Sequence, residues 1–250
     1  MQRTELVAYL NDYLNIANFN DYAPNGLQIE GRDTIKTIVT GVTACQALID
    51  AAIALQADAV LVHHGYFWKN EPAQIVGIKQ KRVKALLAHD INLLAYHLPL
   101  DQHAVLGNNV LLGQLWGLQD ITPGLVGLDS LVRLGRLPKA CSIDAFATLV
   151  SNSLQRPVLH LSGGKNTVQT VAWCSGGAQN YIDQAIAWQA DVYISGEVSE
   201  QTTHLAKEGG VHYFAAGHHA TERLGIKALG EHLADKFGLQ CHFVDIANPV

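Results

Sequence analysis

The sequence predicts an α/β protein built from two similar lobes related by an internal duplication. Two observations support this fold class. Apolar, β-rich segments alternate with amphipathic helical segments along the chain, as they do in parallel sheets whose strands are joined by helices. In addition, the segment Asp50–Asp58 (DAAIALQAD) returns without a gap at residues 183–191 (DQAIAWQAD). We therefore expect an N-terminal lobe over residues 1–125 and a C-terminal lobe over residues 126–250.

Composition narrows the class of protein. The chain has 250 residues, of which 48% are apolar and 16% charged, which is typical of a soluble globular protein with room for two domains. The net charge of −5 argues against non-specific nucleic-acid binding, which relies on neutralising phosphates. The four cysteines form no CxxC pair, and neither a signal peptide nor a membrane-spanning apolar run is evident. We expect reduced thiols, no membrane association and a cytoplasmic location.

The N-terminal lobe is expected to begin with an amphipathic helix, because apolar residues recur at helical spacing between Leu6 and Leu14. Asn20 to Gln28 has the composition of a turn. Thr43 and Gln46 have the spacing of a capping box and predict the start of a helix. The elements predicted after the turn are a strand at 34–42, a helix at 43–56, a strand at 58–64, a helix at 79–89, a strand at 91–96 and a helix at 108–116.

The C-terminal lobe repeats this alternation after a Pro/Gly-rich linker at 121–127. We expect that the last helix and strand of this lobe can pack back on the first lobe. The elements predicted are strands at 131–137, 158–161, 167–174, 191–195, 211–215 and 241–246, and helices at 142–154, 181–188, 199–208 and 221–237.

Two adjacent histidines, His63 and His64, follow the apolar run 58–62 and precede Gly65. Such a run predicts a buried parallel strand that presents side chains at its carboxyl end, where ligands bind in open α/β sheets. Two imidazoles with no basic cluster beside them suggest a divalent metal such as zinc, iron or manganese. A hydrogen-bonded histidine pair that caps the strand is the alternative interpretation.

A histidine and a carboxylate four residues apart follow a strand in each lobe. His97 and Asp101 form this pair in the first lobe, and His218 and Glu222 form it in the second. On a helix, a four-residue step places both side chains on one face. The second pair leads into a predicted helix, whereas Pro99 predicts an extended turn for the first pair.

These positions predict a metal site in the cleft between the two lobes. Three imidazoles and two carboxylates suit two divalent ions that share a bridging carboxylate and a bridging water. The proposed ligands are His63, His64, Asp101, His218 and Glu222. The duplication makes His97 the counterpart of His218, so it is either a further ligand or an acid/base or orienting group close by; we assign it the catalytic role.

Several motifs follow one another along the chain, namely Asn25-Gly26-Leu27-Gln28, His63-His64-Gly65, His97…Asp101, Ser175-Gly176-Gly177-Ala178, Ser195-Gly196-Glu197 and Gly217-His218-His219-Ala220-Thr221-Glu222. Together they resemble the NIF3 family, and in particular its bacterial branch of GTP cyclohydrolase 1 type 2 homologues. The resemblance runs from about Tyr22 to the C-terminus. It implies a two-lobed α/β protein with a dinuclear metal centre between the lobes, assembled as a toroidal homohexamer, and it assigns the same five ligands. Gly65 is a departure, because many members have proline there.

The resemblance implies that the chain opens the imidazole ring of GTP, or of a similar small molecule, by hydrolysis at C8. His97 would then protonate a leaving ring nitrogen. No cluster of basic residues that could bind a triphosphate lies near the proposed ligands; Lys69, Lys165 and Arg223 are isolated. Two alternatives therefore stay open, namely a non-catalytic metal-binding or regulatory interaction protein, and a di-iron oxidase.

Overall fold

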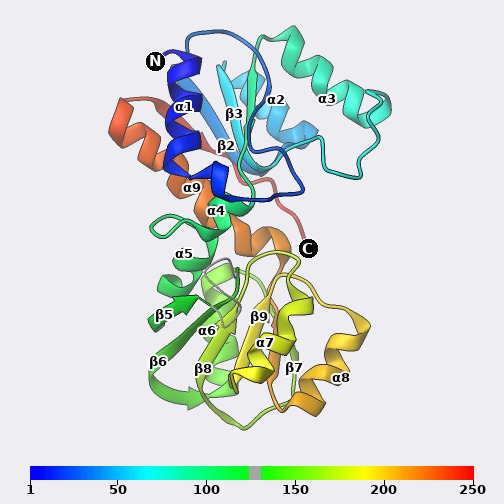
Figure 1. The fold of residues 1–250 in the computed structure, drawn as a ribbon, viewed down its shortest axis with the longest axis vertical. Coiled ribbons are helices and arrows are strands. Elements are labelled where there is room, and N and C mark those ends of the chain that lie inside the picture. The colour runs from blue at the N-terminus through cyan, green and yellow to red at the C-terminus, as the bar shows by residue number, and fades with distance from the viewer. Residues whose placement is uncertain (124–130) are drawn as a thin grey trace. The chain divides into compact units, whose positions relative to one another are not determined.

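The computed structural model describes residues 1–123 and 131–250, which form two compact units (Figure 1). Unit 1 consists of Met1–Leu106 and Gly225–Ala247, and unit 2 consists of Gly107–Leu224 and Asn248–Val250. Helix α9 (His218–Phe237) begins in unit 2, and its residues from Gly225 onward belong to unit 1.

The units divide the chain after Leu106 and after Leu224, whereas the sequence analysis placed one boundary after residue 125. Packing explains the difference. Leu112 of helix α5 (Asn108–Leu115) is buried in a core cluster with Phe146, so this helix belongs to unit 2. Of the predicted linker, residues 121–123 lie in strand β5, and residues 124–127 lie outside the described part of the chain.

Unit 1 contains a five-stranded sheet in the order β1-β4-β3-β2-β11. Four strands run parallel, and β1 pairs antiparallel to β4 at one edge. Strand β1 corrects the sequence analysis, which assigned its first three residues to a turn. The pairing of β11 with β2 agrees with the expectation that the last strand packs on the first lobe. The strands are β1 (Gly26–Ile29), β2 (Thr37–Thr43), β3 (Ala59–His64), β4 (Asn92–Ala95) and β11 (Gln240–Phe243).

Helices cover both faces of the unit 1 sheet (Figure 1), so its central strands are apolar on both sides. Helices α1 (Arg3–Tyr13) and α9 bury leucines such as Leu6 and Leu229 on one face. Helices α2 (Gln46–Ala54) and α3 (Gly77–Ala88) pack on the other. Thr43 is the last residue of β2, and helix α2 begins after Cys45, which is its N-cap residue. The predicted capping box at Thr43 is therefore wrong.

Unit 2 contains a six-stranded sheet in the order β5-β6-β8-β9-β10-β7, in which β8, β9 and β10 are parallel. Helices α5 and α6 lie on one face, and α7 and α8 on the other. The strands are β5 (Gln119–Pro123), β6 (Arg133–Ser142), β7 (Leu159–Leu161), β8 (Thr167–Trp173), β9 (Val192–Ser195) and β10 (His212–Ala215). The helices are α6 (Ile143–Leu154), α7 (Ile182–Ala187) and α8 (Glu200–Gly209).

Matching contacts in the two units support the duplication. Asp58 accepts hydrogen bonds from two backbone N–H groups at the start of β2, at 2.8 and 2.9 Å. Asp191, its counterpart in the repeat, accepts two from β8, both at 2.8 Å. Gln56 and Gln189 also correspond, and both have left-handed backbones, with φ of 51° and 54°. The same helix-to-strand connection is therefore built twice from the repeated sequence.

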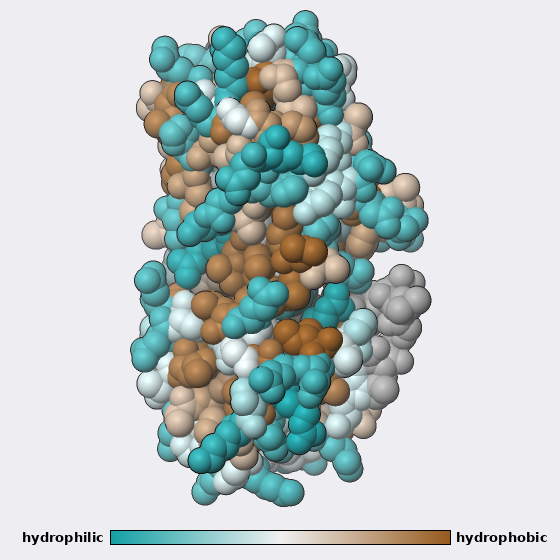
Figure 2. Space-filling model, turned by 90° about the vertical axis from the view of Figure 1, so that its left-hand side faces the viewer, coloured by the Kyte–Doolittle hydropathy of each residue, from teal (hydrophilic) through white to brown (hydrophobic). Residues whose placement is uncertain are grey.

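The outer surface carries polar side chains together with exposed apolar ones such as Val76 and Ile78. Hydrophilic residues cover much of the face shown in Figure 2. Across residues 1–123 and 131–250, the helices lack the combination of length and apolar character that a bilayer-spanning segment needs.

Candidate metal centre

In unit 1, strand β3 ends in His63 and His64, as the sequence predicts. His63 is completely buried, and its Nδ1 lies 3.0 Å from the backbone oxygen of Tyr96. A carbonyl oxygen only accepts, so Nδ1 carries a proton, and in the neutral imidazole Nε2 has the lone pair that a metal ion would bind. This Nε2 lies 3.5 Å from Oδ2 of Asp101. Fixing the tautomer through the other ring nitrogen is how proteins prepare a histidine for a metal.

His97 caps the short helix α4 (Leu98–Gln102), which places Asp101 one turn further on. The predicted extended turn around Pro99 is therefore wrong. Pro99 is the second residue of the helix, where the backbone N–H has no intrahelical acceptor in any case, so proline costs no hydrogen bond there. The histidine–carboxylate pair of the first lobe thus has the helical geometry predicted for the second.

The turn before β1 anchors His97. Oδ1 of Asp21 lies 2.9 Å from Nδ1 of His97, and Oδ2 accepts the backbone N–H of Leu98 at 3.0 Å. Oδ1 of Asn25 accepts the backbone N–H of His97 at 2.7 Å. Burial opposes ionisation of Asp21, but the hydrogen bond and charge of His97 outweigh it and lower the Asp21 pKa to about 2. Sequence analysis missed this role, although an Asp/Asn-rich turn was visible.

Three imidazoles gather at this edge of the unit 1 sheet. His63, His64 and His97 each offer a ring nitrogen within 4.8 Å of the others, a spacing that could hold one metal ion. Their ring centroids lie 4.6 to 5.6 Å apart. The structure thus brings His97, expected to act as an acid/base, into a possible ligand set. The chemistry fits a borderline divalent ion, which prefers imidazole.

In unit 2, His218 is the first residue of helix α9, and Glu222 lies one turn later. Nε2 of His218 lies 3.2 Å from Oε2 of Glu222, and Nδ1 lies 2.7 Å from Oε1 of Glu197. Glu222 is buried, whereas the side chains of His218 and Glu197 are partly exposed. Glu197 follows strand β9, at the position that the repeat aligns with His64. It therefore orients the imidazole of His218 from the side opposite Glu222.

Gly176, in the turn after β8, leaves room for this pair. A Cβ on Gly176 would overlap Oε1 of Glu222 and come within 3.1 Å of Nε2 of His218. The backbone of Gly176 is left-handed, with φ of 64°, and its N–H donates to Oγ1 of Thr221 at 3.0 Å. The glycine turn noted in the sequence therefore gives the histidine–carboxylate pair its space.

Metal binding should depend on pH through the protonation state of His218. Burial disfavours the imidazolium, but hydrogen bonds to and charges on Glu222 and Glu197 outweigh it and raise the His218 pKa to about 9. Because this folded-state value is above the ordinary 6.5, the metal-free protein gains stability that is complete below pH 6.5 and lost as pH rises through about 9.

A metal ion must displace that proton, so we expect affinity for Zn²⁺ or Mn²⁺ to rise with pH up to about 9. NMR titration of the metal-free protein should show His218 titrating near that value. Glu222→Gln should lower the His218 pKa, while Glu231→Gln, an exposed change on the same helix, should not. A midpoint at or below 6.5 would contradict the assigned contacts.

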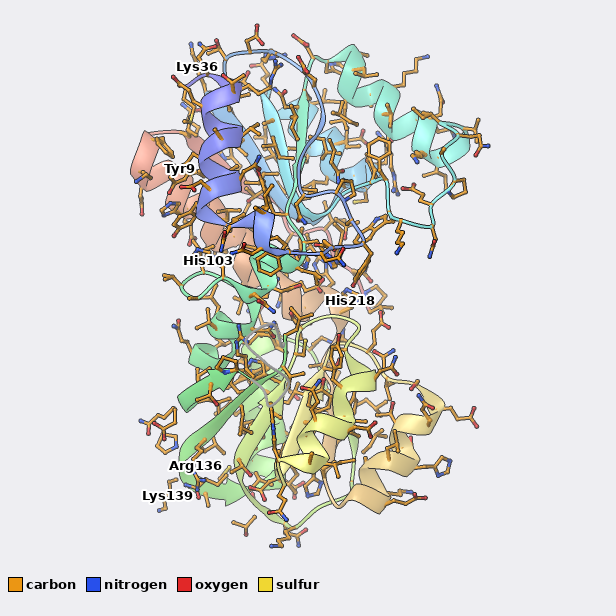
Figure 3. All side chains as sticks on the ribbon, in the orientation of Figure 1. Tyr9, Lys36, His103, Arg136, Lys139 and His218 are labelled. Carbon is orange, nitrogen blue, oxygen red and sulfur yellow. The ribbon has the colours of Figure 1, made fainter. Side chains whose placement is uncertain are left out.

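Other histidines have different environments. Nε2 of His160 lies 3.0 Å from Nδ1 of His212, whose Nε2 lies 2.8 Å from the backbone oxygen of Lys165. His103 packs on the ring of Tyr13, with centroids 4.7 Å apart, and its Nδ1 accepts backbone N–H groups. His103 and His218 are labelled in Figure 3.

Comparison with known proteins identifies relatives over the full chain. The family model of Duf34/NIF3 (NGG1p interacting factor 3) matches residues 1–249. A GTP cyclohydrolase 1 type 2 homolog from Yersinia pestis is 53% identical over 250 residues, which cover 100% of both chains. A protein of the same name from Pseudomonas aeruginosa is 51% identical, over 98% of this chain and 97% of its own.

Solved structures show the same fold. The ybgI protein, a structural genomics target of unknown function, superposes with a TM-score of 0.96 at 50% identity, covering 100% of both chains. A protein from Thermus thermophilus superposes with a TM-score of 0.92 at 36% identity, again over 100% of both chains.

Proposed function

This chain belongs to the Duf34/NIF3 family, and from that premise we propose that it is a metal-dependent hydrolase of a purine nucleotide or a similar ring compound, as in GTP cyclohydrolase 1 type 2. We propose further that it binds two divalent ions, of zinc, iron or manganese. The proposed ligands are His63, His64, Asp101, His218 and Glu222.

One observation carries the proposal. In each unit, a hydrogen-bond partner holds Nδ1 of a histidine and so orients its Nε2 for metal coordination. The backbone oxygen of Tyr96 holds Nδ1 of His63, and Glu197 holds Nδ1 of His218. Both histidines thereby direct Nε2 toward a carboxylate, Asp101 at 3.5 Å and Glu222 at 3.2 Å. This is the outer-sphere support that metal-binding histidines use.

Divalent ions bound by these donors would supply Lewis acidity and a water that ionises near neutral pH. The chain's own residues orient the ligands and move protons. His97, whose Nδ1 is held by Asp21 at 2.9 Å, is the proposed acid for a leaving ring nitrogen, because its other nitrogen faces the histidine cluster.

Turnover of GTP by protein purified without chelators tests the proposal. We expect GTP to be consumed with formation of a formyl product, in anaerobic as well as aerobic buffer, and activity to disappear on metal removal and return with added metal. Protein that holds both ions but leaves a panel of purine nucleotides unchanged would contradict hydrolysis. A strict requirement for oxygen would indicate an oxidase.

His97→Ala separates the two roles of this histidine. As a proton donor it should lower turnover by about 10²–10⁴-fold while leaving the metal content unchanged. Loss of an ion in this variant, measured by elemental analysis, would make His97 a ligand and remove it as the acid. Exposed His89, at the end of α3, supplies the matched control His89→Ala.

A further inference from the structure

Unit 2 contains a cavity of about 660 Å³ at the carboxyl ends of strands β9 and β10. Its volume lies within the range of small-molecule sites, roughly 300–1,000 Å³. Apolar side chains such as Val158, Val198 and Ala215 form much of its wall, and Arg156 and Glu197 contribute charged side chains to it. Gly217, the residue before His218, also lines it.

Arg156 is held in this cavity by the backbone. It follows helix α6, where its N–H donates to the backbone oxygen of Ser151 at 3.0 Å. Its guanidinium lies directly on Gly217, so that a Cβ at that position would overlap Nη1. Gly217 has a φ of 98°, a conformation that also favours glycine. The side chain of Arg156 thus occupies space that only glycine leaves open.

The guanidinium of Arg156 has unused hydrogen-bonding capacity. Nη1 is buried and has no hydrogen-bond partner within residues 1–123 and 131–250, and no carboxylate among those residues pairs with it. Nη1 itself is closed off against Gly217, but the guanidinium charge is unpaired within the described residues, and because Arg156 lines the cavity, an anion bound there would pair with that charge. Arg156 is therefore placed to bind an anionic group.

Glu197 adds a second condition that a ligand bound in this cavity must meet. Its Oε1 is engaged by Nδ1 of His218 at 2.7 Å, and its carboxylate remains an acceptor on the cavity wall. A ligand that satisfies both charged residues carries an anionic group together with N–H or O–H donors. A phosphorylated nucleoside meets both conditions, whereas a simple fatty acid supplies no donor.

We propose that Arg156 binds a phosphate group of the substrate in this cavity, next to the metal-ligand candidate His218. The choice of phosphate among anions rests on the function proposed above. Arg156 thereby supplies the cation for phosphate recognition that the sequence around the proposed ligands lacked. The site was missed because Arg156 is distant in sequence from every histidine–carboxylate motif.

Binding of GMP and of guanosine by the purified protein, measured by calorimetry, tests this inference. Arg156→Gln should weaken GMP binding by about tenfold to a hundredfold, because charge-assisted hydrogen bonds are lost, and leave guanosine binding unchanged. Arg156→Lys should retain part of the affinity for GMP. Arg136→Gln, a surface change in β6 of the same unit (Figure 3), is the control and should behave as wild type.

Equal weakening of GMP and guanosine by Arg156→Gln would show a structural role and overturn the inference. So would wild-type protein that does not bind GMP more tightly than guanosine. GMP binding that ignores Arg156 but disappears on metal removal would place the phosphate on the metals instead. The proposed function fails separately: Arg156-dependent GMP binding without any nucleotide turnover would keep the phosphate site and reject the hydrolase.

Discussion

Replacing His64 by alanine, or Glu222 by glutamine, should reduce the bound metal from the proposed two ions per chain to one or none. Each change removes a proposed ligand while sparing the packing around it. His64 is the partly exposed last residue of β3, and glutamine matches the shape of the buried Glu222. A zinc ion or a comparable ion is held by only about four ligands, so the loss of one ligand should greatly weaken its binding. Elemental analysis after gel filtration measures the content.

Matched variants make this result specific. His89→Ala removes an exposed imidazole from unit 1, and Glu231→Gln removes an exposed carboxylate from the same helix as Glu222. Both should keep the wild-type metal content. Circular dichroism of the metal-free proteins should show the same fold for all four variants. Full occupancy by two ions in His64→Ala would contradict its assignment as a ligand.

Gly176→Ala should weaken metal binding by about 10–100-fold, the size of effect seen when groups that position ligands are changed. The added methyl group would overlap the carboxylate of Glu222, which must then move. Left-handed backbone also makes alanine unfavourable there, by roughly 1–2 kcal/mol. Metal titration and thermal unfolding of the metal-free protein separate these two effects.

Gly210→Ala is the control for backbone strain. Gly210 ends helix α8 with a φ of 69°, close to the 64° of Gly176, but apart from its chain neighbours no atom of residues 1–123 and 131–250 lies within 4 Å of a Cβ built there. It should therefore lose similar stability, roughly 1–2 kcal/mol, while keeping wild-type metal affinity. Equal metal affinity in the two variants would show that Gly176 does not protect the position of Glu222.

The parts predicted correctly from the sequence depend on local patterns. The apolar run before His63 and His64 specified a buried strand, because only covered parallel strands tolerate apolar residues on both faces. The repeated segment ending in Asp58 and Asp191 specified two related units, because the same local sequence forms the same hydrogen bonds to a neighbouring strand.

The parts that could not be predicted depend on contacts between distant residues. Helix α4 forms despite Pro99 because Asp21 and Asn25, far earlier in the chain, accept the N–H groups of Leu98 and His97. Strand β1 forms in a turn-like sequence because β4 offers it an edge. Arg156 reaches the proposed site only through the packing of its guanidinium on Gly217. The Asp/Asn-rich turn was visible in the sequence, but local patterns do not show which distant groups these residues contact.

Anomalous scattering from crystals grown with Mn²⁺ tests the central claim most directly. We predict two peaks per chain, each coordinated directly by side chains from the set His63, His64, Asp101, His218 and Glu222. Two results would contradict a centre assembled from both halves of the duplicated chain. One is manganese bound elsewhere, and the other is peaks that contact the histidines of unit 1 but neither His218 nor Glu222.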